Sequence, residues 1–220
     1  MKIKLVDSVN YPSLEKKLSF AGLDSWTNLV HEMYNYKTYR YAVLQDDKPL
    51  ATLGLVEIRH PVFGHYLTTA PFGSYGGFAF ETSEARDLLL DEARRLAEDI
   101  KAEYVSIRFD KGDSTPPDNW LQNPNYFTYL IDLPTDSETL LKTFSSDHRN
   151  HVRKSLKKGF EIHIGHLDLL DDAYEALSKS MHELGSPYHS KKYLRIMAEL
   201  LGNTLEFAVI YNAQGKISGG

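Results

Sequence analysis

The hydrophobic and polar residues of this chain follow strand-like and helix-like periods in turn. In the N-terminal half, segments rich in β-forming residues predict strands at 2–7, 39–44, 50–58, 104–109 and 126–133. The second and third of these flank a turn and predict a β-hairpin. Between 83 and 99 apolar residues recur at three- and four-residue steps, which predicts an amphipathic helix. The stretch 111–125 is dense in Pro, Asp, Asn and Gly and is expected to be a loop.

The C-terminal part begins the same order of elements again. It predicts a strand at 160–164, helices at 168–184 and 191–201, and then a segment, 207–220, that matches 41–54. Aligned without a gap, the two segments share Ala42 with Ala208, Val43 with Val209 and Gly54 with Gly220. This favours an α/β protein built as a tandem repeat, with the second copy incomplete. We expect the chain to be a fragment of a longer protein. The alternative is that 216–220 closes the second sheet as a short edge strand.

The segment 135–159 has a charge opposite to that of the rest of the chain. The chain has 25 Lys+Arg against 30 Asp+Glu, yet five bases and no acid lie between 148 and 160: Arg149, Arg153, Lys154, Lys157 and Lys158. Thr135 and Glu138 match a capping box and Gly159 the residue after a helix end, so one helix is predicted.

A basic helix on an acidic protein favours a site for an anion. We expect Arg149, Arg153 and Lys157 to contact it, because guanidinium forks suit the phosphate oxygens of a small ligand or a tRNA backbone. Two other interpretations remain open. The helix could lie on anionic lipid, or its cations could be solvated and offset the helix dipole.

The loop 71–77 carries a second group of candidate site residues. Two adjacent glycines follow an aromatic residue there, and glycine allows a backbone to approach a ligand closely. Tyr75, Gly76 and Gly77 are therefore expected to line a cleft, with a plain turn or bulge as the alternative. The loop fits neither a Walker nor a dinucleotide-binding pattern.

The loop 185–190, between two predicted helices, carries the third group. Tyr188 and His189 are candidates to act as acid or base or to orient a substrate, and Arg195 lies one helical turn into the next helix. The alternative is a helix stop followed by Ser190 as an N-cap, with Tyr188 only packing.

Composition narrows the class of protein further. With no Cys, the chain has no disulfide, thiolate metal site or cysteine nucleophile. No HExxH pattern is present, and metal binding is not expected. The N-terminus lacks the apolar region of a signal peptide, and no apolar run is long enough for a membrane-spanning helix. We expect a cytoplasmic protein.

Three segments in this order resemble the FemABX-like family of peptidoglycan-bridge aminoacyltransferases: 62–67 leading into 71–77, then 147–159, then 181–189. The resemblance extends to FemAB-type proteins and BioF2-like acetyltransferase domains. The resemblance implies two GNAT-like domains in tandem, each with the mixed sheet flanked by helices of acyl-CoA N-acyltransferases. It predicts a first domain at 1–133, a basic connecting helix at 134–159 and the N-terminal part of a second domain at 160–220.

The resemblance also implies transfer of an aminoacyl or acyl group to an amine of a cell-wall, envelope or exopolysaccharide precursor. Aminoacyl-tRNA or acyl-CoA would be the donor co-substrate, no cofactor would be bound, and the enzyme would work at the inner face of the membrane. The basic helix would face phosphates of the tRNA or of a nucleotide- or lipid-linked acceptor. Tyr188 or His189 would orient or deprotonate the amine.

This sequence departs from the family pattern in two ways. It lacks the rest of the second domain, and it lacks the Arg/Gln-x-x-Gly-x-Gly/Ala loop that holds the pyrophosphate of CoA in GNAT enzymes. Two competing functions therefore stay open. One is a CoA-dependent N-acetyltransferase of a small amine. The other is a non-catalytic module that binds anionic membrane or nucleic acid.

Overall fold

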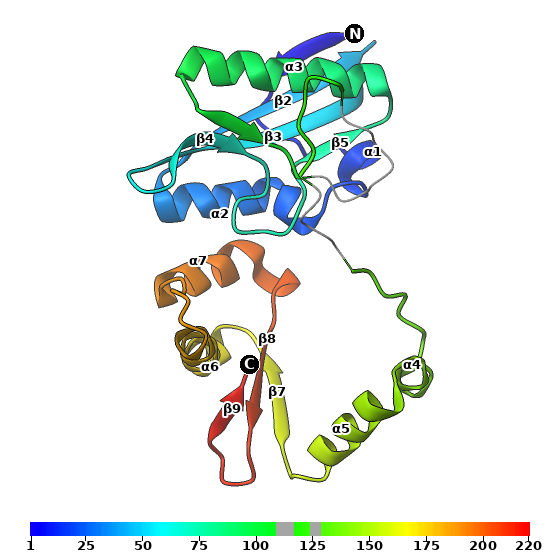
Figure 1. Cartoon of the computed structure of the whole chain (residues 1–220), viewed down its shortest axis with the longest axis vertical. Helices are drawn as coiled ribbons and strands as arrows, with labels where there is room; N and C mark the ends of the chain where they lie inside the picture. The colour runs from blue at the N-terminus through cyan, green and yellow to red at the C-terminus, as the bar shows by residue number, and fades with distance from the viewer. Residues whose placement is uncertain (109–116, 124–128) are drawn as a thin grey trace. The chain divides into compact units, whose positions relative to one another are not determined.

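The computed structural model describes residues 1–108, 117–123 and 129–220 of the chain (Figure 1). It divides into two compact units, Met1–Phe127 and Thr128–Gly220. Each unit has its own sheet and its own helices.

The first unit is built on a mixed sheet whose strand order is β1-β2-β3-β4-β6, with β5 also paired to β3. Its strands are β1 Lys2–Leu5, β2 Lys37–Gln45, β3 Lys48–His60, β4 Gly64–Thr68, β5 Phe78–Phe80 and β6 Tyr104–Ser106. All pairs are antiparallel except β4 with β6. The long central strand β3 is buried from Ala51 to Ile58, which is typical of a strand covered on both faces.

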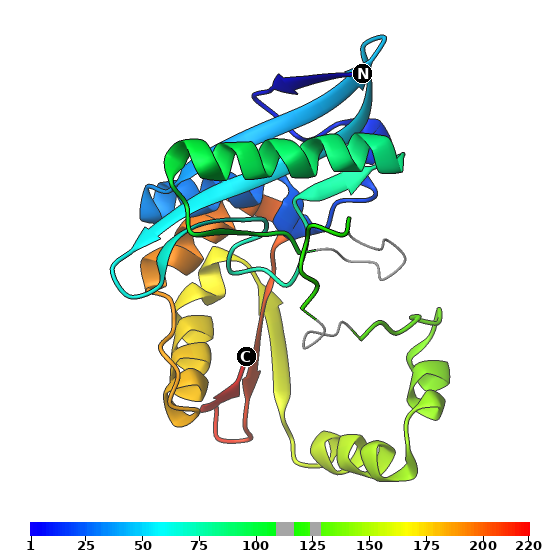
Figure 2. The same cartoon turned by 45° about the horizontal axis from the view of Figure 1, so that its top comes forward.

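Helices cover the two faces of this sheet (Figures 1 and 2). On one face lies α3 Ser83–Ile100, whose buried Leu89 and Ala93 join Leu53 and Leu55 of β3 in the main core. On the other face lies α2 Asp24–Tyr34, preceded by α1 Pro12–Glu15 and the 3₁₀ turn η1 Phe20–Gly22. The predicted helix at 83–99 is confirmed, and Thr82 caps it by accepting a hydrogen bond from the backbone N–H of Ala85.

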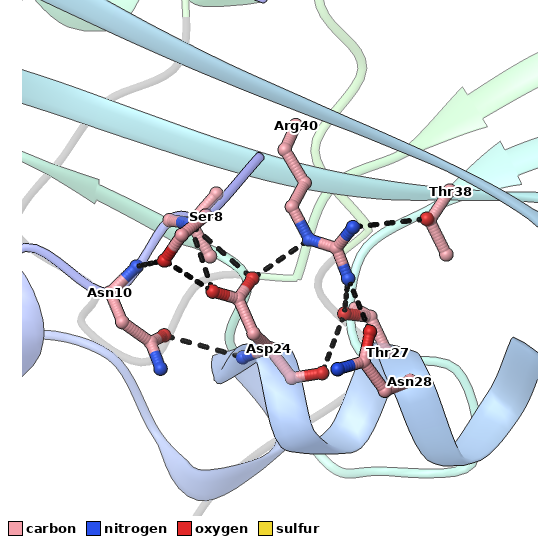
Figure 3. Close-up of polar contacts among 8 residues, drawn as sticks. Ser8, Asn10, Asp24, Thr27, Asn28, Thr38 and Arg40 are labelled. Carbon is pink, nitrogen blue, oxygen red and sulfur yellow. Dashed lines mark hydrogen bonds and ion pairs between the residues drawn. The ribbon is translucent and has the colours of Figure 1, made fainter. Parts of the chain in front are cut away.

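A polar network joins the segment after β1 to α2 and β2 (Figure 3). The Asp24 carboxylate accepts from Ser8 Oγ at 2.5 Å and from Arg40 Nε at 2.8 Å. The Arg40 guanidinium also donates to Thr27 Oγ1 at 2.7 Å and to Asn28 Oδ1 at 2.8 Å. Both charged side chains are only 14–16% exposed, so the ion pair is largely shielded from water. With its hydrogen bonds it joins α2, β2 and the segment after β1.

The second unit has a three-stranded antiparallel sheet, β7-β8-β9, and four α-helices within its described residues. Its elements are α4 Ser137–Thr143, α5 Ser146–Leu156, β7 Glu161–Gly165, η2 Leu167–Leu169, α6 Leu170–Glu183, α7 Lys191–Leu201, η3 Gly202–Thr204, β8 Phe207–Tyr211 and β9 Ile217–Gly219. Its buried core includes Leu170, Ala173, Leu194 and Val209. The mixed α/β architecture with helices flanking a sheet is confirmed. Residues 217–219 pair with β8 as a short edge strand.

The predicted helix at 135–159 is two helices rather than one. α4 ends where Phe144 adopts an extended ψ of 157°, and Ser145 then caps α5 by accepting from the backbone N–H of His148. The N-cap of α4 is Asp136, whose carboxylate accepts from Thr139 N at 2.8 Å, and not Thr135. The apolar period runs through the break, so periodicity alone does not reveal it.

Several strand and loop predictions fall at the edge of the described chain. The strand predicted at 104–109 is observed as Tyr104–Ser106, and residue 109 lies outside the described residues. Of the predicted loop 111–125, residues 117–123 contain a turn, while 111–116 and 124–125 lie outside the described residues. Of the predicted strand 126–133, residues 126–128 lie outside them and 129–133 form no strand.

Candidate functional site

The connection between α6 and α7 places two candidate catalytic side chains next to each other. α6 ends in a turn in which Gly185 adopts a φ of 68° and Ser186 N donates to Met181 O at 2.9 Å. Ser190 starts α7 by accepting from Tyr193 N. Tyr188 and His189 lie between these two helix ends, both half-buried. The loop position predicted for both residues is confirmed. The helix stop and the Ser190 N-cap, which the alternative interpretation predicted, are present as well.

Ring contacts hold the imidazole of His189. Its centroid lies 4.1 Å from that of Tyr193 with an angle of 20° between the planes, and Tyr188 meets it nearly edge-on at 5.8 Å. Tyr193 is 4% exposed and belongs to the core of the unit. Sequence reasoning missed Tyr193, although its position four residues after His189 at a helix start is a usable signal.

Burial shifts the pKa values of His189 and Tyr188 in opposite directions. It lowers the pKa of His189, which favours the neutral imidazole that can accept a proton at neutral pH. Burial, with a smaller effect from Tyr174, raises the pKa of Tyr188, so the phenol keeps its proton and can donate a hydrogen bond. The pair is therefore suited to accept a proton from one ligand atom and to orient another.

α5 carries the predicted anion contacts on an exposed surface. Arg149 is half-buried, and its Nη1 donates to the carbonyl oxygen of Phe144 at the end of α4. Arg153 and Lys157 are exposed, and within the described chain neither of them forms an ion pair with a carboxylate. The acid in α5, Asp147, lies 3.5 Å from His151 instead. The positive charge of the helix is thus available to an anionic ligand.

The loop 71–77 does make the close backbone approach that its glycines suggested, and its partner is the chain itself. Gly76 and Gly77 are buried at φ values of 130° and 77°. A Cβ on Gly22 of η1 would lie 2.3 Å from Gly77 N, and Gly77 O accepts from Gly54 N at 2.7 Å. Tyr75 is half-buried, and its carbonyl oxygen accepts a hydrogen bond from Ser19 Oγ.

The two units divide the candidate residues between them. Tyr75, Gly76 and Gly77 belong to the unit Met1–Phe127, whereas the other candidates belong to Thr128–Gly220. Within the second unit the structure brings Tyr188 and His189 together. Arg195 is exposed on α7.

A buried carboxylate in the first unit was also missed by sequence reasoning. Glu57 of β3 is 3% exposed and accepts hydrogen bonds from Tyr39 at 2.7 Å, Arg59 at 2.5 Å and His65 at 2.9 Å. Burial alone would raise the pKa of Glu57, but these three bonds outweigh it and lower the pKa. Burial and the bond to Glu57 raise the pKa of Tyr39 to about 12. Both carboxylate oxygens of Glu57 are hydrogen-bonded, which fits a structural role.

The described residues contain no group of three or more His, Asp or Glu side chains arranged to hold a metal ion. No helix among them combines the length and apolar character needed to cross a membrane.

Comparison with known proteins gives a likeness of structure rather than of sequence. No protein-family model and no curated protein matches the chain. A GNAT family acetyltransferase from Staphylococcus aureus subsp. aureus USA300_TCH1516 and an aminoglycoside 6'-N-acetyltransferase from Acinetobacter haemolyticus are 13% and 16% identical to it, each matching 60% of this chain and 100% of its own. Their TM-score of 0.35 is too low to indicate a common fold.

The crystal structure of FemX gives a closer match, with a TM-score of 0.66 at 17% identity. The match covers 96% of this chain and 57% of FemX, so the chain spans little more than half the length of that protein. At the level of the fold this agrees with the resemblance to the FemABX-like family. Nearly the whole of this chain therefore shares the fold of the matching part of FemX.

Proposed function

We propose that this chain belongs to an N-acyltransferase of FemAB type that transfers an aminoacyl or acyl group to an amine. The observation that carries the proposal is the match to the FemX fold over 96% of the chain. Two of the segments that resemble the FemABX-like family, 147–159 and 181–189, lie in and after α5 and at the α6–α7 connection. The proposed acceptor is a cell-wall, envelope or exopolysaccharide precursor reached at the cytoplasmic face of the inner membrane.

The reaction needs a base and an oriented carbonyl rather than a protein nucleophile. The acceptor nitrogen attacks the donor carbonyl carbon, a C–N bond forms, and the carbonyl oxygen becomes an oxyanion. His189, neutral because burial lowers its pKa, takes the proton that the nitrogen loses. Tyr188 donates a hydrogen bond that orients the amine or the carbonyl. The bond from carbon to the donor's oxygen or sulfur then breaks, and the leaving group takes up the proton.

Both candidate donors, aminoacyl-tRNA and acyl-CoA, are polyanions. We assign Arg153 and Lys157 to their phosphates because both side chains are exposed and without a carboxylate partner among the described residues. Arg149 uses one N–H for the Phe144 carbonyl and keeps further donors for a ligand. Arg195 would add a contact from α7. In the first unit Tyr75 remains a candidate substrate contact because it is half-buried, whereas Gly76 and Gly77 are buried against Gly22 and Gly54.

Salt dependence of tRNA binding tests this assignment. Arg153→Ala with Lys157→Ala should weaken binding and reduce the slope of log K against log salt by about 1.4 to 1.8, which is two phosphate contacts. Lys2→Ala with Lys4→Ala, two exposed cations of β1, serves as the matched control. An unchanged slope in the α5 variant would exclude the phosphate contacts. Tighter binding of charged than of uncharged tRNA identifies that donor, whereas thermal stabilisation by acetyl-CoA alone identifies the CoA-dependent alternative.

One observation favours the non-catalytic alternative. The apolar side of α5 is exposed to solvent. Val152 is 42% and Leu156 76% exposed, and Phe144 before the helix is 38% exposed. An amphipathic helix with an exposed apolar side and cations on its polar side can lie on anionic lipid. Val152→Asp with Leu156→Asp would then abolish flotation with anionic vesicles, while Val62→Asp, at a site of the first unit that is 78% exposed, would not. If both variants leave flotation unchanged, this alternative fails.

A further inference from the structure

His189, the proposed base, lies directly before Ser190, the N-cap of α7, and therefore outside the hydrogen-bonded turns of that helix. Gly185, where the connection begins, has open space around it, since a Cβ there would meet no atom within 4 Å. Ring packing against Tyr188 and Tyr193 therefore contributes to the orientation of the imidazole.

Tyr193 is the firmly held ring against which His189 packs. Its backbone N–H points at Ser190, with the carbonyl oxygen at 2.9 Å and Oγ at 3.3 Å. Its side chain is 4% exposed, beside Leu194 at 1%. The ring planes of His189 and Tyr193 are 20° from parallel with centroids 4.1 Å apart, so one face of the imidazole is covered.

We propose that Tyr193 is a positioning residue, whose buried ring sets the plane of the His189 imidazole and keeps water from one of its faces. The inference rests on the function proposed above, in which His189 accepts the proton of the acceptor amine. Tyr193 itself touches neither substrate. It acts through His189, in the way that a supporting residue fixes a catalytic side chain.

The environment of His189 makes the effect of Tyr193 measurable. The pKa of His189 is lowered by burial and not by a neighbouring charge of the described chain. Among the described residues, the phenols of Tyr188 and Tyr193 face His189, and Tyr174 of α6 acts on Tyr188. The nearby Lys191 ammonium is 2.6 Å from the Asp171 carboxylate, which balances its charge. Loss of the covering ring should therefore admit water and raise the pKa of His189 toward its ordinary value.

The test is an NMR titration of the His189 imidazole in the whole chain, with the signal assigned by its loss in His189→Gln. Tyr193→Leu loses the ring, so its His189 should titrate at a higher pH than in the unaltered protein, and Tyr193→Phe, which keeps the ring, should titrate below the Leu variant. Equal titration of the Leu variant and the unaltered protein would overturn the proposal. Because Leu could unfold α7, a second measurement uses the unaltered protein. A stacked ring should shift the His189 ring protons upfield, and random-coil shifts would also overturn the proposal.

The titration needs neither donor nor acceptor, so it separates this inference from the proposed function. If the titration moves and the lower limb of the pH–rate profile moves with it, both hold. If it moves while the transfer rate and its pH profile stay unchanged, Tyr193 still positions the imidazole, and it is the role of His189 as the base that is refuted.

Discussion

Gly22 is a position at which one added methyl group should destabilise the first unit. A Cβ there would lie 2.3 Å from Gly77 N, 3.1 Å from Gly77 Cα and 3.3 Å from Gly76 C. All three atoms are backbone, so no flexible side chain can move aside. In Gly22→Ala either η1 or the loop 71–77 must shift.

The expected cost follows from what that shift disturbs. Overpacking a tight site costs about 1–3 kcal/mol. The loop is also held by the bond from Gly54 N to Gly77 O at 2.7 Å and by the bond from Ser19 to Tyr75, each of which contributes about 1 kcal/mol. Partial loss of both bonds brings the expected loss of unfolding free energy to about 3 kcal/mol, near the upper end of single-residue effects.

Urea unfolding followed by tryptophan fluorescence measures this loss in the unit where it occurs. Both tryptophans, Trp26 and Trp120, lie in Met1–Phe127, and Trp26 Nε1 donates to Pro71 O at 2.8 Å. With a slope of about 1.5 kcal/mol per molar urea, the midpoint should fall by about 2 M. Gly54→Ala is the matched control, because its Cβ would meet Gly77 O at 3.9 Å, an ordinary contact. Equal midpoints for the two variants would refute the reasoning.

Three further predictions concern polar contacts. Arg40→Met leaves the partly buried Asp24 carboxylate without its cation and should lower the unfolding free energy by about 2 kcal/mol, measured by urea unfolding; Asp24→Asn in the same chain should recover part of it. Ser145→Ala removes the N-cap of α5 at a cost of about 1 kcal/mol, visible as faster amide exchange in that helix, with Ser146→Ala as the control. Because the folded state lowers the pKa of Glu57 from 4.5, its contribution to stability is present above pH 4.5 and lost as pH falls below it. Acid unfolding of Glu57→Gln should lack that contribution.

Elements with a strong local period were predictable from the sequence. The helix expected at 191–201 is observed as Lys191–Leu201, and the one expected at 83–99 as Ser83–Ile100. In both, apolar residues at helical spacing meet a core along the whole length, so local preference and packing agree. The break between α4 and α5 was not predictable from the period, because the apolar stripe continues through Phe144 and only the cap at Ser145 marks the new start.

The candidate site was predictable to a smaller extent. Its residue types and their place in loops can be read from the sequence, since Tyr188 and His189 follow a helix stop. The contact of Gly22 with Gly77 joins residues far apart in the chain, and no local pattern announces it. The direction of the pKa shift of His189 likewise depends on burial, which only the folded chain defines.

The unpaired positive charge on α5 does not arise from a shortage of carboxylates in the chain as a whole. The chain carries 30 acids against 25 Lys and Arg, and cations elsewhere in the described chain do find acids: Lys17, Arg40, Arg59, Arg86, Arg94, Arg95 and Lys191. Arg153 and Lys157 therefore stay unpaired because the segment around them is poor in acid. Their field reaches about 8 Å into physiological salt, so it acts on a polyanion before contact. Added salt should then slow association with that polyanion more than it speeds dissociation, and an unchanged association rate would refute this electrostatic role.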